Sequence, residues 1–138
     1  MNNIYVLDAC ALIALFNDEP GADDVERILR EAFNGTAEIY MNKINIYEIY
    51  YGIYKSSGKE NAEQTHNLIK KLPIIITEHF SDDIFYEAAR LKSLYKISVA
   101  DSIALGEAIV RNAQLLTADH HEFDVVEQHE KVKIHWIR

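Results

Sequence analysis

Two hydrophobic spacings alternate along this chain. Short, continuous apolar runs such as residues 4–7 and 115–118 are separated by longer stretches in which apolar side chains recur every three or four positions. The short runs are typical of buried parallel strands, and the longer period is that of amphipathic helices. Strands are predicted at residues 4–7, 38–41, 73–77, 115–118 and 133–137. The alternation predicts an α/β fold with a central, mainly parallel sheet.

Helix-end signals support the same division of the chain. Asn42, Ser81 and Ser98 each precede a helical stretch and belong to the residue types that cap helix N-termini. Asn34-Gly35 is a stop signal for the helical stretch before it. Helices are predicted at residues 9–16, 23–33, 43–55, 60–71, 82–95 and 99–110, and no element is predicted between residues 118 and 133.

Four acidic residues lie at the ends of these predicted elements. Asp8 and Asp119 end apolar runs, whereas Glu48 and Asp101 lie near helix starts. Ligands of parallel sheets bind outside the carboxyl ends of the strands, so we expect the four side chains to converge. Carboxylates crowded into one pocket repel one another unless divalent cations bind there, and oxygen ligands select Mg²⁺ or Mn²⁺. Metal-assisted hydrolysis of phosphodiesters is the chemistry that such a site performs.

Each acid also has an explanation without a metal. Asp8 can be a turn residue or the N-cap of the next helix. Ser98-x-x-Asp101 is a capping-box pattern. Glu48 can be a solvated helical acid, and Asp119 can be a turn residue. These alternatives stay open for each residue taken singly, and only the four together favour the metal site.

Composition limits the class of protein. The chain has 138 residues, of which 49% are hydrophobic, and this suits one domain with a real core. A net charge of −8 argues against a broad basic surface for DNA, although it leaves a nuclease possible and suits a basic protein partner. We expect a cytoplasmic protein, because the sequence shows neither a signal peptide nor a membrane-spanning run, and Cys10 has no second cysteine to pair with.

The acids and their neighbours resemble the PIN-domain ribonucleases, most closely the VapC-type toxins of VapBC toxin–antitoxin systems. The resemblance covers essentially the whole length, and its most specific segment is Ser98-Val99-Ala100-Asp101-Ser102-Ile103-Ala104-Leu105. The other segments that carry it are Tyr5-Val6-Leu7-Asp8, Ala11-Leu12-Ile13-Ala14-Leu15, Asn45-Ile46-Tyr47-Glu48, and Leu115-Leu116-Thr117-Ala118-Asp119 with Phe123.

This resemblance implies a PIN-like three-layer α/β/α fold that spans residues 1–138 as a single domain. It implies a Mg²⁺-dependent endoribonuclease, with Mn²⁺ as a substitute, that acts as a toxin by cutting tRNA, rRNA or mRNA. The metal would be held by Asp8, Glu48, Asp101 and Asp119. The implied partners are a cognate antitoxin with a basic C-terminal segment, the RNA substrate and a second copy of the chain in a homodimer.

The chain departs from the family pattern around these acids. Ala9 and Asn45 stand where the family often has a hydroxyl residue. We expect Asn45 and Thr117 to support the acids, although Asn45 could instead cap its helix and Thr117 could be a plain strand residue. Thr117 could hold Asp119 or touch phosphate. Asp124 could be a fifth acid or a surface turn residue.

Two other functions remain open. One is a PIN-like interaction module without catalytic activity. The other is an α/β hydrolase that uses Asp8 as a covalent nucleophile, although Cys10 stands where a second Asp is expected in such enzymes.

Several further side chains have both a functional and a plain interpretation. Ile44, Tyr47, Tyr51 and Tyr54, with Tyr50 beside them, have helical spacing. This stripe is predicted as core or as a homodimer face, with an antitoxin groove and base stacking as alternatives. His120 and His121 are interpreted as exposed loop residues rather than transition-metal ligands. Cys10 is expected to be a small core residue.

Overall fold

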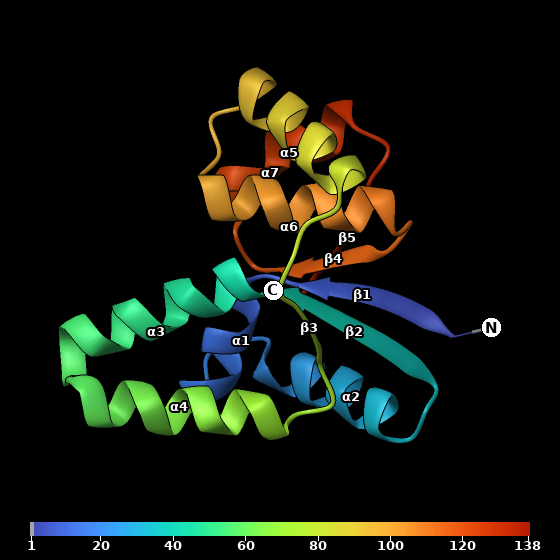
Figure 1. Cartoon of the computed structure of the whole chain (residues 1–138). Helices are drawn as coiled ribbons and strands as arrows, with labels where there is room; N and C mark the ends of the chain where they lie inside the picture. The colour runs from blue at the N-terminus through green and yellow to red at the C-terminus, as the bar shows by residue number, and fades with distance from the viewer. Residues whose placement is uncertain (1) are drawn as a thin grey trace.

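Every strand of the central sheet runs parallel to its neighbours. The computed structural model describes residues 2–138, and its five strands lie in the order β3-β2-β1-β4-β5 (Figure 1). The strands are β1 (Asn3–Leu7), β2 (Ala37–Asn42), β3 (Ile75–Thr77), β4 (Gln114–Thr117) and β5 (Lys133–Trp136). The helices are α1 (Ala9–Phe16), α2 (Ala22–Phe33), α3 (Lys43–Ser57), α4 (Lys59–Lys71), α5 (Asp82–Leu94), α6 (Val99–Val110) and α7 (His120–His129). The predicted three-layer α/β/α fold is confirmed.

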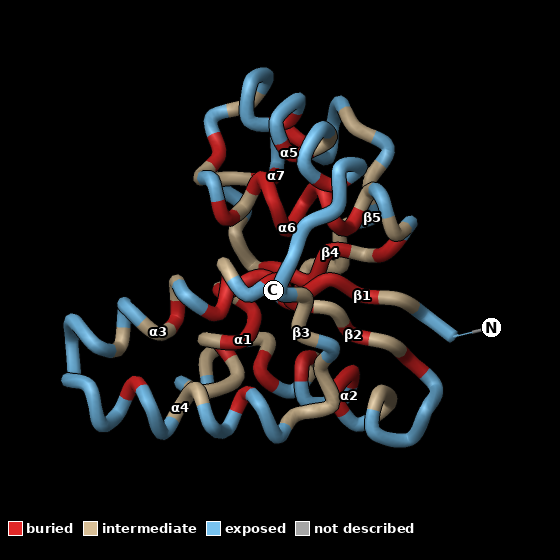
Figure 2. The backbone as a smooth tube through the Cα atoms, in the orientation of Figure 1, coloured by how far each residue is buried: buried red, intermediate tan, exposed pale blue. Residues whose placement is uncertain are grey.

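The two faces of the sheet carry separate cores because neighbouring strand residues point to opposite sides. Tyr5 and Leu7 of β1 pack with helices α1, α2, α3 and α4, whereas Val6 packs with α5, α6 and α7. The buried residues gather where the helices meet the sheet, and the outer helical turns are exposed (Figure 2). No helix within residues 2–138 combines the length and apolar character that crossing a membrane requires.

The predicted caps hold as the sequence indicated. Asn42, Ser81 and Ser98 each accept a hydrogen bond from a backbone N–H in the first turn of the following helix. The predicted strand 73–77 begins only at Ile75. Pro73 has no N–H to donate to a ladder, and the Ile74 N–H donates to the Leu72 carbonyl instead.

Helix α7 was missed by the sequence analysis. Only Phe123 and Val126 of its residues are buried, so its apolar period is too sparse to stand out. The interpretation of His120 and His121 as loop residues is wrong, because they open this helix. Asp124 is likewise helical and exposed, and it is not a turn residue.

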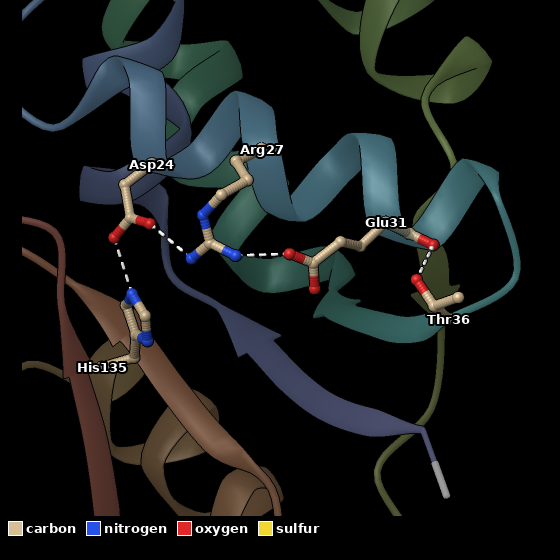
Figure 3. A network of polar contacts seen from close by, with 5 residues as sticks. All are labelled: Asp24, Arg27, Glu31, Thr36 and His135. Carbon is tan, nitrogen blue, oxygen red and sulfur yellow. Dashed lines mark hydrogen bonds and ion pairs between the residues drawn. The ribbon is translucent and has the colours of Figure 1, made fainter.

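A polar network ties α2 to the far edge of the sheet (Figure 3). Asp24 accepts hydrogen bonds from Arg27 at 2.7 Å and from His135 Nε2 of β5 at 2.6 Å. Arg27 also donates to Glu31, whose backbone carbonyl accepts from the Thr36 hydroxyl at 3.1 Å. The network thus connects the second helix with the last strand, although the two are distant in the sequence.

Candidate metal centre

The acids gather where strands β1 and β4 end. These strands pair directly, with Leu7 opposite Leu116, so Asp8 and Thr117 follow at the same rim of the sheet. A cleft of about 320 Å³ opens at this rim. Its lining includes Glu48 from α3, Asp101 from α6, Asp119 after β4 and Glu122 from α7. The structure therefore brings three of the four predicted acids into one cleft.

Asp8 is the fourth acid, and it is only 1% exposed. Its Oδ1 accepts from the backbone N–H of Ala11 at 2.9 Å, so Asp8 does cap α1, and its Oδ2 accepts from the Thr117 hydroxyl. Burial raises the pKa of Asp8 to about 7 in spite of these hydrogen bonds, and the charges of Asp119 and Glu48 add to the rise. A carboxyl group in this position is poised to change its charge near neutral pH.

Asp101 lies in the first turn of α6. Its backbone N–H donates to the Ser98 hydroxyl at 3.1 Å, which completes the predicted N-cap. Burial, the largest cause, and the charges of Asp8 and Glu48 together raise the pKa of Asp101 to about 7. The side chain is half-buried and lines the cleft, so the cap alone does not account for its position.

Thr117 connects two of the acids. Its hydroxyl donates to Asp8 and accepts from the backbone N–H of Asp119 at 3.0 Å. Thr117 is fully buried, so it fixes the loops that carry these acids and does not reach a phosphate in the cleft. Asp119 in turn caps α7 by accepting from the Glu122 N–H at 3.1 Å.

Glu48 from α3 and Glu122 from α7 also line the cleft. Burial raises the pKa of Glu48, as do the charges of Glu122 and Asp119. Asp101, Asp119 and Glu122 each offer a carboxylate oxygen within 4.8 Å of the others. Glu122 was missed by the sequence analysis, although Asp119-x-x-Glu122 has capping-box spacing and would have indicated a helix start there.

Asn45 lies one turn before Glu48 on α3 and is fully buried. Among the described residues, neither its amide oxygen nor its amide nitrogen has a hydrogen-bond partner. The capping alternative for Asn45 is wrong, because Asn42 caps this helix. A buried amide without partners is costly, so the fold tolerates here a polar group that its own residues do not satisfy.

Asp124, His120 and Cys10 have different surroundings from those that the sequence predicted. The Asp124 carboxylate contacts His120 Nδ1 at 2.8 Å and is not part of the cleft lining, and His120 Nε2 contacts the Arg138 carbonyl at 2.9 Å. Cys10 lines the cleft rather than the core, and burial raises the pKa of its thiol to about 11, as does the charge of Asp8. The thiol is therefore neutral at physiological pH.

The tyrosine stripe of α3 is not core. Tyr47, Tyr51 and Tyr54 are 61%, 48% and 48% exposed, so the core interpretation of these three side chains is wrong. Tyr51 lines the acidic cleft. These rings are available to a ligand or a partner.

A protein-family model described as PIN domain matches residues 5–128. No curated protein matches the chain. Among solved structures, the chain is similar to VapBC2 from Rickettsia felis bound to a DNA fragment from its promoter, with 19% identity, a TM-score of 0.72, and 96% of this chain and 97% of that one covered. It is also similar to VapBC-1 from nontypeable Haemophilus influenzae, with 19% identity, a TM-score of 0.71, and 97% and 98% covered. A toxin–antitoxin complex from Klebsiella pneumoniae has 21% identity, a TM-score of 0.59, and 86% and 89% covered.

Proposed function

Because the chain belongs to the PIN domain family, we propose that it is a metal-dependent endoribonuclease and the toxin of a type II toxin–antitoxin pair. One observation carries the proposal. Acids from α3, α6, α7 and the end of β4 line a single cleft, and Asp8 lies next to them with a pKa near 7. Holding like charges together costs free energy, and a bound cation offsets that cost.

The donor set fits a hard divalent cation. The groups that meet in the cleft are carboxylates, and oxygen ligands of this kind suit Mg²⁺, with Mn²⁺ as a substitute. We expect Asp8, Asp101 and Asp119 to hold the ion directly or through water, and Glu122 is close enough to join them. When bound, the ion acidifies a water molecule and polarises the scissile phosphate.

Three further residues near the proposed cation site would position the attacking water and the acids. Glu48 would accept a hydrogen bond from the attacking water and orient it, because its carboxylate lines the same cleft as Asp119 and Glu122. Thr117 fixes the positions of Asp8 and Asp119 relative to each other through its two hydrogen bonds. The Asn45 side chain lies one turn before Glu48, and a buried water molecule would satisfy its amide groups, which have no partner among the described residues.

The proposed antitoxin has both an acidic and an apolar surface to bind. An apolar groove between α1 and α3 is lined by Ile13, Phe16, Gly52 and Ile53, and it shares Ile13 and Glu48 with the cleft. A basic C-terminal segment would cross the acids, and an apolar side chain next to it would anchor in this groove. The net charge of −8 favours such a cationic partner. The similar fold of a solved toxin–antitoxin complex supports an antitoxin as the partner.

The two alternative functions, a hydrolase with Asp8 as nucleophile and an inactive interaction module, have less support. Asp8 does not suit a covalent nucleophile, because it is 1% exposed and both oxygens accept hydrogen bonds. An inactive interaction module would not need repelling acids in one cleft.

The expected homodimer stays a prediction, and light scattering of the purified chain checks it.

The decisive experiment is cleavage of total cellular RNA by the purified chain, followed by sequencing of the new RNA ends. We expect discrete cuts in Mg²⁺ or Mn²⁺ and none in EDTA. Asp101→Asn should lower the cleavage rate by orders of magnitude, because it removes one carboxylate from the cation site. Glu127→Gln is the matched control, since this exposed acid of α7 contacts Trp136 and does not line the cleft. Equal cleavage by wild type and Asp101→Asn would refute the assigned site.

A further inference from the structure

A second pocket, of about 410 Å³, lies between α3 and α4 and differs in character from the acidic cleft. Its size lies within the range of small-ligand sites. Basic, aromatic and amide side chains line it, namely Lys43, Tyr47, Tyr50, His66, Asn67 and Lys70. The hairpin that forms the pocket projects beyond the sheet and its tip is exposed (Figures 1 and 2).

The charge of this hairpin is opposite to that of the whole chain. Residues 43–71 contain five lysines and three glutamates, whereas the net charge of the chain is −8. Among the described residues, Glu63 is the one carboxylate that lines the pocket, against the two lysines Lys43 and Lys70, so the lining keeps a net positive charge. Lys43 lies 3.5 Å from Glu78 in an exposed pair, and such pairs contribute little, so Lys43 remains available to a ligand. The pocket is therefore suited to an anionic group.

The pKa of His66 also reflects the positive charge of this pocket. Burial lowers the pKa of His66, and the charges of Lys70 and Lys43 lower it further. The imidazole is thus neutral at physiological pH and offers one donor and one acceptor. It packs edge-on against Tyr50, with 5.8 Å between ring centroids.

Aromatic rings connect the two pockets across the outer face of α3. Tyr47 lines the basic pocket, Tyr51 lines the acidic cleft, and their ring centroids are 5.1 Å apart. Both rings are exposed, and Tyr47 is 61% exposed. A nucleic-acid strand that crosses α3 would pass from one pocket to the other over adjacent rings, which is the arrangement that single strands use for base stacking.

We propose that the pocket between α3 and α4 binds a nucleotide of single-stranded RNA that flanks the scissile phosphate. Lys43 and Lys70 contact backbone phosphate, Tyr47 stacks on a base, and the strand continues over Tyr51 to the acidic cleft. This inference rests on the proposed ribonuclease function. Charge distinguishes RNA from the antitoxin here, because the lysines repel a basic segment that the cleft attracts.

The test compares RNA binding by matched variants. The probe is a fluorescein-labelled single-stranded RNA of twelve nucleotides and mixed sequence, measured by fluorescence anisotropy with the full chain carrying Asp101→Asn to prevent cleavage. The pocket variants are Lys43→Gln/Lys70→Gln and Tyr47→Ala. The controls are Lys55→Gln/Lys71→Gln, which changes the same charge on the same hairpin outside the pocket, and Tyr86→Ala, an exposed tyrosine of α5.

We expect each pocket variant to weaken RNA binding about tenfold, because stacking on one aromatic ring or contact with two phosphates contributes on this order. The Lys43→Gln/Lys70→Gln variant should also show a salt dependence that is less steep. The magnitude of the slope of log affinity against log salt should fall by about 1.4, since each phosphate contact with a single strand accounts for about 0.7. Tyr47→Phe should keep most of the affinity, and the controls should bind like the unsubstituted protein.

Four outcomes would overturn the inference. The first is equal RNA affinity in the pocket and control variants. The second is unchanged RNA affinity with lost neutralisation by a co-expressed antitoxin, which would assign the pocket to the protein partner. The third is a wild-type chain that neither binds nor cuts RNA, in which case the ribonuclease proposal fails together with the pocket. Wild-type cleavage in Mg²⁺ with no effect of the pocket variants would refute the pocket alone.

Discussion

At the scale of single residues, Asp8 shows how the fold changes the chemistry of a side chain. An Asp in water is ionised at neutral pH, but burial raises the pKa of Asp8 from 3.8 to about 7, and Asp101 rises to about the same value. In the metal-free folded protein, these two groups bind protons between about pH 4 and pH 7 that the unfolded chain has released. The free energy of unfolding of the metal-free protein therefore falls as pH rises through this window. These two groups do not destabilise the protein at more acidic pH.

Asp8→Asn should remove part of this pH dependence. In EDTA at pH 8 we expect the variant to be more stable than wild type by about 1–3 kcal/mol, because a buried charge near two other acids is gone. At pH 4 the gain should vanish, since Asp8 is then already neutral in the folded state. Urea unfolding at both pH values measures this. Parallel pH dependence in the two proteins would contradict the assigned environment of Asp8.

At the scale of elements, two glycines in helices have opposite roles. Gly106 on α6 allows α5 to approach closely: a Cβ at this position would lie 3.0 Å from the backbone nitrogen of Ala88 and 3.2 Å from its Cα. A Cβ at Gly52 on α3 would have no atom from outside its own stretch of helix within 4 Å among the described residues. The same substitution therefore tests packing at one position and helix propensity at the other.

Gly106→Ala should lower the free energy of unfolding by about 1–3 kcal/mol, because backbone atoms of α5 must move away. Gly52→Ala should raise it by about 0.5–1 kcal/mol, since alanine loses less backbone freedom in a helix than glycine does. Thermal or urea unfolding checks both variants. A Gly106→Ala variant as stable as wild type would show that the α5–α6 contact is not as close as described.

At the scale of the whole molecule, surfaces of different character lie side by side around α3. The acidic cleft, the apolar groove between α1 and α3, and the basic pocket between α3 and α4 all include residues of this helix. A net charge of −8 dominates at long range, so approach of a cationic partner is favoured before any contact forms. In the proposed complex, the apolar groove would then supply affinity that salt does not screen.

The proposed antitoxin complex should respond to both contributions. We expect its dissociation constant to rise with salt, because the basic segment is attracted through screened charges. Gly52→Trp should weaken the complex at every salt concentration by filling the apolar groove, whereas Gly52→Ala leaves room for the anchor. Isothermal titration calorimetry of the three proteins distinguishes the effects. Binding that ignores both salt and the tryptophan would place the antitoxin elsewhere.

The sequence by itself determined the order of every element except α7, and many of their ends. Hydrophobic period and capping chemistry are local properties, so residues 9–16 were predicted as the helix that the structure contains, and Asn42, Ser81 and Ser98 cap as expected. The parallel topology followed from the alternation of strands and helices. It also indicated that Asp8 and Asp119, at the ends of paired strands, lie at one rim.

Tertiary structure alone decided burial and the exact membership of the site. Tyr47, Tyr51 and Tyr54 of α3 have core-like spacing, yet they are exposed because α4 packs beside this helix and does not cover them. Glu122 joins the cleft because α7 starts directly after β4, and its sparse apolar pattern hid that helix. The raised pKa of Asp8 depends on burial and on the charges of Asp119 and Glu48. Desolvation and charge coupling depend on which distant elements meet, and local sequence does not encode them.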